Sequence, residues 1–134
     1  MTKIHRYAYN KLVRDKTQER MLAKNCSTYG YLLNEDEYIT ELIKKLVEEA
    51  KEVVTAPAEK KAIELADLLE VVHALSAVYN ISMEQVEIER KKTFEQRGGF
   101  AQRYYVNHAD VPESSPAYTY YIKNSDRYPE IDFE

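Results

Sequence analysis

Four acidic residues in two short runs are the part of this 134-residue sequence that is best suited to chemistry. Glu49 and Glu52 lie three positions apart in the first run, and Glu64 and Asp67 repeat that spacing in the second. Residues three apart on an α-helix point to the same side, so each run would offer a pair of carboxylates. Carboxylate oxygens are the ligands that Mg²⁺ and Mn²⁺ prefer. The four residues therefore predict a divalent-cation site if the two runs lie on facing helices.

Two consecutive helices are predicted where these runs lie. Asn34 and Glu37 fit a capping box, which predicts a helix over about residues 34–54. Pro57 marks a break, and the next helix is predicted over about residues 58–79. A short connection between two helices makes them antiparallel neighbours, so a helical hairpin should carry the four carboxylates.

The two predicted helices differ in their apolar faces. In the first, the apolar residues fall within an arc of roughly 140°, with Glu49 just outside its edge and Glu52 farther round. The second is apolar nearly all round, which predicts a largely buried helix, yet Glu64 and Asp67 lie within that surface. A buried carboxylate is costly unless it is paired or bound to a cation. A cationic partner is therefore expected for Glu64 and Asp67.

Simpler interpretations of the acidic residues remain open. Glu49 and Glu52 alone fit solvated charges, because exposure is the default for acidic side chains. Salt bridges from the hairpin or its neighbours are an alternative to a metal, with these basic residues as candidates: Lys44, Lys45, Lys60 and Arg90. Four carboxylates across one hairpin are too many for salt bridges to be the simplest solution, so a hard-oxygen metal site is preferred.

Other metal chemistries are not supported by the histidines and the cysteine. A di-iron bundle needs a Glu-x-x-His motif on two helices, and His73 lies six residues beyond Asp67 on the opposite side of the helix. Zinc has no ligand set, because Cys26 is the one cysteine. No role is assigned to Cys26, His73, His5 or His108.

Flanking signals predict a helical domain over residues 1–100. Asp15 and Gln18 resemble a capping box for a short helix to about residue 24, and Ser82 and Gln85 form another for a helix that ends before Gly98. Residues 26–33 fit either a short strand or an ordered loop. The fold class predicted is all-α, a bundle of four to five helices around the central hairpin.

The composition changes after residue 100. Residues 101–134 hold three of the four prolines and six of the twelve tyrosines, so they are treated as a separate Tyr/Pro-rich extension. It would pack on the same domain or on a neighbouring subunit. Residues 118–122 are strand-like, which leaves open a short β-element in this tail or an arm across a neighbour.

Charge and hydropathy limit the partners. A formal net charge of -4 argues against binding a nucleic acid polymer, which needs a basic excess. No apolar run approaches the length of a membrane span, and the first ten residues lack the apolar core of a signal peptide. A lone cysteine favours a reducing compartment. A cytoplasmic protein without a membrane partner is expected.

Four segments resemble motifs of one enzyme family. Residues 48–52 (EEAKE) and 64–67 (ELAD) resemble the paired E-E-x-x-E and E-x-x-D motifs of the MazG-like all-alpha nucleoside triphosphate pyrophosphohydrolases. Residues 9–16 (YNKLVRDK) and 97–100 (RGGF) are similar to the signature and the ending of its phosphoribosyl-ATP pyrophosphohydrolase-like subgroup. The resemblance does not extend past Phe100.

The resemblance implies a specific reaction. Members of the family cleave a nucleoside triphosphate between its α and β phosphates, giving the monophosphate and pyrophosphate. Glu49, Glu52, Glu64 and Asp67 would hold Mg²⁺ (or Mn²⁺), and Glu49 or Glu52 would orient or deprotonate the attacking water. Two alternatives remain: phosphoribosyl-ATP as the substrate, and a non-catalytic helical interaction module with the same fold.

Basic residues at both ends of the resembling region have a complementary role. They would grip the phosphates of a nucleotide substrate, although a solvated charge is an equally good interpretation for each one: Lys11, Arg14, Lys16, Lys92 and Arg97. An apolar second helix in so small a domain also predicts a homo-oligomer. Family members commonly form dimers or tetramers, which agrees.

Overall fold

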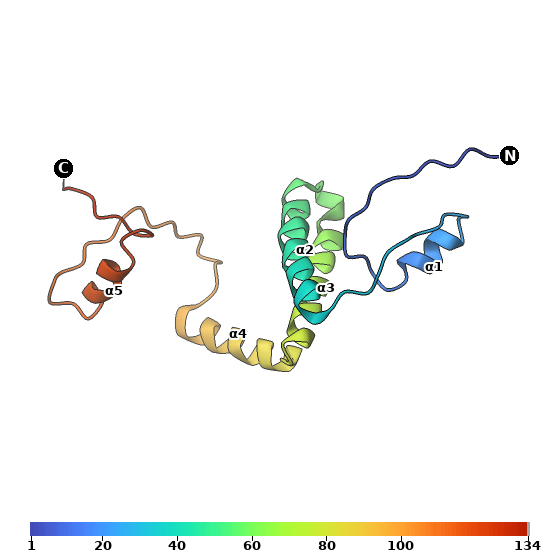
Figure 1. The fold of residues 1–134 in the computed structure, drawn as a ribbon. Coiled ribbons are helices and arrows are strands. Elements are labelled where there is room, and N and C mark those ends of the chain that lie inside the picture. The colour runs from blue at the N-terminus through green and yellow to red at the C-terminus, as the bar shows by residue number, and fades with distance from the viewer. Residues whose placement is uncertain (134) are drawn as a thin grey trace. The chain divides into compact units, whose positions relative to one another are not determined.

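The structure is a computed structural model that describes residues 1–133 of the chain (Figure 1). All of its regular elements are helices, and no strand occurs in the described residues. In chain order they are α1 (Thr17–Leu22), α2 (Glu35–Thr55), the 3₁₀ helix η1 (Ala58–Lys60), α3 (Lys61–Val78), α4 (Met83–Arg97) and α5 (Tyr118–Lys123). The predicted all-α fold class is confirmed. The chain divides into two units, Met1–Gln96 and Arg97–Glu134, which are described separately.

Helices α2 and α3 pack side by side as the predicted hairpin (Figure 1). The capping box that starts α2 is complete. The Glu37 backbone N–H donates to Asn34 Oδ1 at 2.9 Å, and the Asn34 N–H donates back to Glu37 Oε1 at 3.1 Å. These two bonds satisfy backbone donors that a helix start leaves without partners, so α2 begins where the sequence predicts.

The turn between α2 and α3 is determined by its extended backbone and by a lysine side chain that bridges the two helices. Ala56 is extended, with φ -66° and ψ 144°, and Pro57 precedes η1. Lys61, the first residue of α3, donates its ammonium to the carbonyl of Val53 and, at 3.1 Å, to that of Val54. A cation on the last carbonyls of a helix satisfies free acceptors and complements the helix dipole. Lys61 therefore ties the start of α3 to the end of α2.

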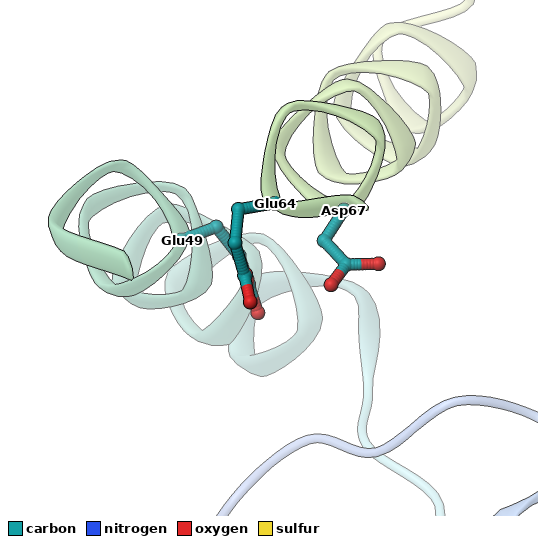
Figure 2. Close-up of side chains that lie close together, drawn as sticks. All are labelled: Glu49, Glu64 and Asp67. Atoms are coloured by element: carbon teal, nitrogen blue, oxygen red, sulfur yellow. The ribbon is translucent and has the colours of Figure 1, made fainter. Parts of the chain in front are cut away.

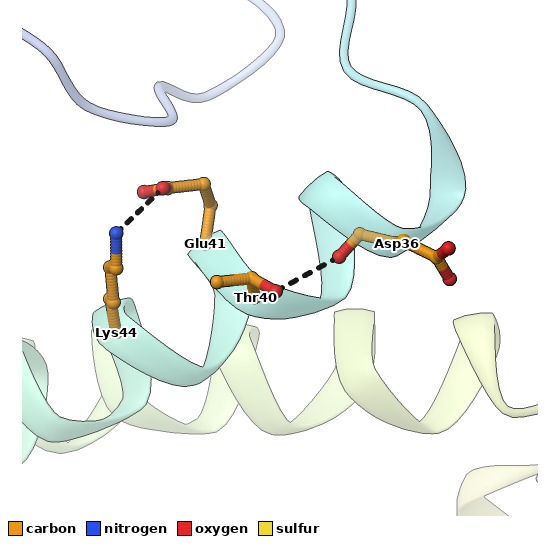
Figure 3. A network of polar contacts seen from close by, with 4 residues as sticks. All are labelled: Asp36, Thr40, Glu41 and Lys44. Atoms are coloured by element: carbon orange, nitrogen blue, oxygen red, sulfur yellow. Dashed lines mark hydrogen bonds and ion pairs between the residues drawn. The ribbon is translucent and has the colours of Figure 1, made fainter.

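Local bonds hold part of the solvent side of α2 (Figure 3). The Thr40 hydroxyl donates to the Asp36 carbonyl at 3.0 Å, and Lys44 pairs with Glu41, one turn earlier, at 3.0 Å. An ion pair such as Lys44–Glu41 contributes only about 0.2–0.5 kcal/mol, and a hydroxyl bonded to the carbonyl four residues earlier adds no more. The position of α2 in the hairpin therefore depends on the packing of its opposite side.

The core of the first unit is small. Leu42 of α2 and Val71 of α3 are the buried apolar residues of the described chain, at 3% and 7% exposure. Buried Ser76 donates its hydroxyl to the Ile81 carbonyl just beyond α3. The prediction of a largely buried second helix is therefore wrong for the isolated chain. One neighbouring helix covers one side of α3, and Leu69 on another side stays 51% exposed.

The flanking helices match their predicted signals only in part. The capping box proposed at Asp15 does not form, because α1 has Lys16 as its N-cap residue and no side-chain cap bond. Ser82 does cap α4, since its hydroxyl accepts the Gln85 backbone N–H at 3.1 Å. Gly98 follows α4 with φ +79°, a left-handed value that suits glycine at a helix end.

The second unit corrects the prediction for the tail. Residues 118–122 are strand-like by composition but lie in α5, so the β-element considered there is absent. The Tyr118 N–H donates to the Ser115 carbonyl at 3.1 Å, and this bond begins the helical turn. The rings of Tyr120 and Tyr121 then meet Tyr128, with the Tyr121–Tyr128 centroids 5.3 Å apart. Aromatic residues need a partner strand to form a sheet, and here they pack on one another instead. Residues 26–33 form neither helix nor strand, which leaves the loop of the two alternatives.

None of the helices in the described part of the chain combines the length and the apolar character that crossing a bilayer requires.

Candidate metal site

Three of the four predicted carboxylates converge on one side of the hairpin. Glu49 comes from α2, and Glu64 and Asp67 come from α3 (Figure 2). One oxygen from each side chain lies within 4.8 Å of the oxygens of the other two. All three residues are half-buried. The two helices therefore bring Glu49 together with two acidic residues that lie fifteen and eighteen positions later in the sequence.

The hairpin turn explains this meeting. Glu49 lies in the second half of α2, and Glu64 lies in the first turn of α3. Because the chain reverses at Ala56 and Pro57, the end of α2 runs beside the beginning of α3. Asp67 follows Glu64 by three residues, which keeps it on the same side of α3. The i, i+3 spacing seen in the sequence is thus the feature that places both α3 carboxylates at the site.

The site carries more negative charge than its surroundings balance. The pKa of Glu49 is raised, first by partial burial and then by the negative charges of Asp67 and Glu52. Lys45 acts in the opposite direction and lowers it. A raised pKa means that the ionised form of Glu49 is disfavoured where it stands. A cation at this position would relieve that cost.

An arginine far away in the sequence provides part of the counter-charge. Arg14 pairs with Asp67, with Nη2 and Oδ1 2.9 Å apart, and Lys11 pairs with Glu48 at 3.3 Å. Two of the basic residues proposed for phosphate binding therefore reach the hairpin. The sequence did not indicate an Arg14–Asp67 pair, because no local pattern links residues 53 positions apart.

The lysines and arginine considered as neutralising partners are placed differently. Lys44 pairs with Glu41 on α2, and Arg90 pairs with Glu87 on α4. Lys45 influences Glu49 through its charge without an ion pair among residues 1–133. The close salt bridge to the carboxylates therefore comes from Arg14.

Glu52 stands beside the cluster and not in it. Its side chain is exposed, and it lines an open surface hollow of about 460 Å³ together with other residues of α2: Lys44, Val47, Glu48, Lys51 and Thr55. Its charge nevertheless raises the pKa of Glu49 one turn earlier. The structure thus separates three grouped carboxylates from a fourth that lies nearby but outside the group.

The remaining predicted phosphate-binding residues are not paired with the carboxylates. Lys16 is the exposed N-cap residue of α1. Lys92 pairs with Glu89 on its own helix at 3.5 Å. Arg97 ends α4 and belongs to the second unit. Among the five, Lys11 and Arg14 are the residues that the first unit holds against the hairpin.

The donor set suits a hard divalent cation. Ligand oxygens lie about 2.0–2.1 Å from Mg²⁺, so two oxygens on one ion are at most about 4.2 Å apart. The three oxygens lie within 4.8 Å of one another, which is wider than the spacing on one ion, so the side chains would rotate inward to hold it. The groups are carboxylates only, without the thiolates or imidazoles that zinc prefers. The residues present therefore fit Mg²⁺ or Mn²⁺.

Comparisons with known proteins add no assignment. The sequence matches no protein-family model, no curated protein and no solved structure.

Proposed function

We propose that this protein is a Mg²⁺-dependent nucleotide pyrophosphohydrolase that cleaves nucleoside triphosphates between the α and β phosphates. The observation that carries the proposal is the convergence of Glu49, Glu64 and Asp67 from two helices within 4.8 Å. The motifs EEAKE and ELAD, which resemble those of the MazG-like family, supply the reaction class. Mn²⁺ is the alternative ion, because it accepts the same oxygen ligands.

The chain's residues divide into three roles. Glu49, Glu64 and Asp67 hold the ion, which would neutralise phosphate oxygens and make water a better nucleophile. Glu52 is exposed next to Glu49 and outside the group, so it is the better placed of the two α2 carboxylates to orient or deprotonate a water. Lys11 and Arg14, on the segment that reaches the hairpin, bind phosphate oxygens of the substrate.

The proposal is tested by pyrophosphate release from a panel of nucleoside triphosphates with Mg²⁺. Glu64→Gln and Asp67→Asn remove one ligand charge each with little change of shape. Loss of a single group that merely supports a ligand costs about 10–100-fold, so loss of a ligand should cost about 100-fold or more. Glu70→Gln is the matched control, because Glu70 is an exposed acidic residue on the same helix outside the group.

Each outcome of the assay has a definite meaning. Release that falls in both ligand variants and persists in Glu70→Gln supports the proposed site. Release that is undiminished in Glu64→Gln and Asp67→Asn contradicts it. Release from phosphoribosyl-ATP alone would assign the same chemistry to the narrower substrate. No release from any nucleotide would favour the non-catalytic helical module.

A further inference from the structure

The N-terminal arm, residues 1–16, contacts both helices of the hairpin through two ion pairs close to the carboxylates. Lys11 of the arm pairs with Glu48 of α2 at 3.3 Å. Arg14 pairs with Asp67 of α3 at 2.9 Å. The arm has no helix or strand of its own, and these two ion pairs attach it to the hairpin at Lys11 and Arg14.

The Asp67 carboxylate takes part in two sets of contacts. It belongs to the group formed with Glu49 and Glu64, and it also receives the Arg14 guanidinium. A guanidinium group does not lose its proton in proteins, so it acts as a permanent counter-ion. A divalent cation at the group would need the same carboxylate and would repel the guanidinium beside it.

We propose that Arg14 is a resident counter-ion of the carboxylate group, and that a divalent cation displaces it from Asp67 and so loosens the N-terminal arm. The inference rests on the proposed function, because it takes Glu49, Glu64 and Asp67 as the metal ligands. By linkage, arm docking weakens metal binding by the same factor by which metal weakens arm docking. Metal binding also frees the Arg14 guanidinium, which can then bind a triphosphate oxygen.

The exposure of the ion pair sets the size of this coupling. The Arg14 side chain is 63% exposed and that of Asp67 is 37% exposed. Pairs this open to water are weak, so their loss changes an equilibrium constant by up to about fivefold. Removing Arg14 should therefore tighten metal binding by about two- to fivefold.

Titration calorimetry with MgCl₂ or MnCl₂ alone, without nucleotide, measures the first consequence. Arg14→Gln is expected to bind the ion about two- to fivefold more tightly than the wild type. Arg20→Gln is the matched control. Arg20 is an exposed arginine of α1 that forms no ion pair in the described chain, and its variant has the same charge change. Equal gains in both variants would indicate a general charge effect and overturn the inference.

Limited proteolysis with chymotrypsin measures the second consequence on the intact chain. Tyr7 and Tyr9 are exposed arm residues, and Tyr29 is an exposed residue outside the arm that serves as an internal control. In the wild type, Mg²⁺ should raise cleavage at Tyr9, which lies two residues before Lys11, relative to Tyr29 by about two- to fivefold, since opening of the arm becomes more frequent. In Arg14→Gln, cleavage of the arm should be raised already and no longer respond to Mg²⁺.

The two experiments separate this inference from the proposed function. If the wild type binds Mg²⁺ and Arg14→Gln binds it equally or more weakly, the displacement of Arg14 is refuted while the metal site stands. If neither protein binds Mg²⁺ or Mn²⁺, the metal site fails and the displacement fails with it. Tighter binding in Arg14→Gln together with Mg²⁺-dependent release of the wild-type arm supports both.

Discussion

Glu49→Gln should have opposite effects on stability in the absence and in the presence of Mg²⁺. The substitution keeps the size of the side chain and removes one negative charge from the group of Glu49, Glu64 and Asp67. Without a cation, the negative charges of Asp67 and Glu52 repel that of Glu49, and they raise its pKa after the larger contribution of burial. With a cation bound, the Glu49 carboxylate becomes one of its ligands. The sign of the change in stability therefore reports whether a metal binds.

The magnitude follows from the spacing. Two unit charges within 4.8 Å repel each other by about 1 kcal/mol when the field passes mainly through water. Glu49 faces two such neighbours, and Arg14 on Asp67 and the nearby Lys45 offset part of the repulsion. A net gain of about 1 kcal/mol in metal-free Glu49→Gln corresponds to a rise in Tm of about 4–8 °C for a unit of this size.

Thermal unfolding in EDTA and in MgCl₂ is the assay. At a hundredfold excess of Mg²⁺ over its Kd, the wild type should gain about 2.7 kcal/mol, whereas Glu49→Gln lacks one ligand and gains much less. The order of the two Tm values should then reverse. Glu70→Gln controls for screening by the added salt, because Glu70 is exposed and outside the group.

The pH dependence gives a second check on the same group. The folded-state pKa of Glu49 is raised above its ordinary value of 4.5, so its contribution to stability is fully present below pH 4.5 and is lost as pH rises through the folded pKa. In EDTA, the advantage of Glu49→Gln should therefore shrink as pH falls toward 4.5. A metal-free variant that is less stable than the wild type at neutral pH, or equal gains from Mg²⁺ in both proteins, would refute the reasoning.

Three further predictions concern stability and assembly. Asn34→Ala should lower the free energy of unfolding by about 1 kcal/mol in a urea titration, because it removes the capping box of α2; an unchanged midpoint would contradict this. Ser76→Ala should cost about 1 kcal/mol in the same titration, because the Ile81 carbonyl loses its buried donor, and Ser76→Thr should retain part of that bond. Light scattering should give a mass of at least a dimer, since Leu65 and Leu69 of α3 are 53% and 51% exposed, and Leu69→Glu should reduce it. A stable monomer in the wild type would exclude the homo-oligomer.

The sequence predicted the parts of the fold that local interactions decide. The Asn34–Glu37 capping box needs only four consecutive residues, and it forms as predicted. The i, i+3 pair of Glu64 and Asp67 depends only on helix geometry, and it reaches the site. In both cases the deciding contacts lie within one turn of helix, where spacing alone determines which groups meet.

Features that depend on contacts between distant residues could not be predicted from the sequence. The Arg14–Asp67 pair joins an irregular arm to α3, and no periodicity connects the two. The tail from Tyr118 to Lys123 has residues that favour strands, yet it is helical because no strand is present in residues 1–133 for it to pair with. Glu52 shares its motif with Glu49 but lies outside the group of three, because the side chain that reaches α3 is set by the packing of the hairpin.

The structure changes the physical argument for a cation. From the sequence, Glu64 and Asp67 needed a partner because their helix should be buried, yet both are only half-buried. Burial alone is therefore a weak reason. Repulsion is a second reason, because three carboxylates meet while Arg14 is the ion-paired cation beside them. One ion-paired arginine, with Lys45 acting on Glu49 from farther away, leaves the three carboxylates with excess negative charge, which a divalent cation would balance.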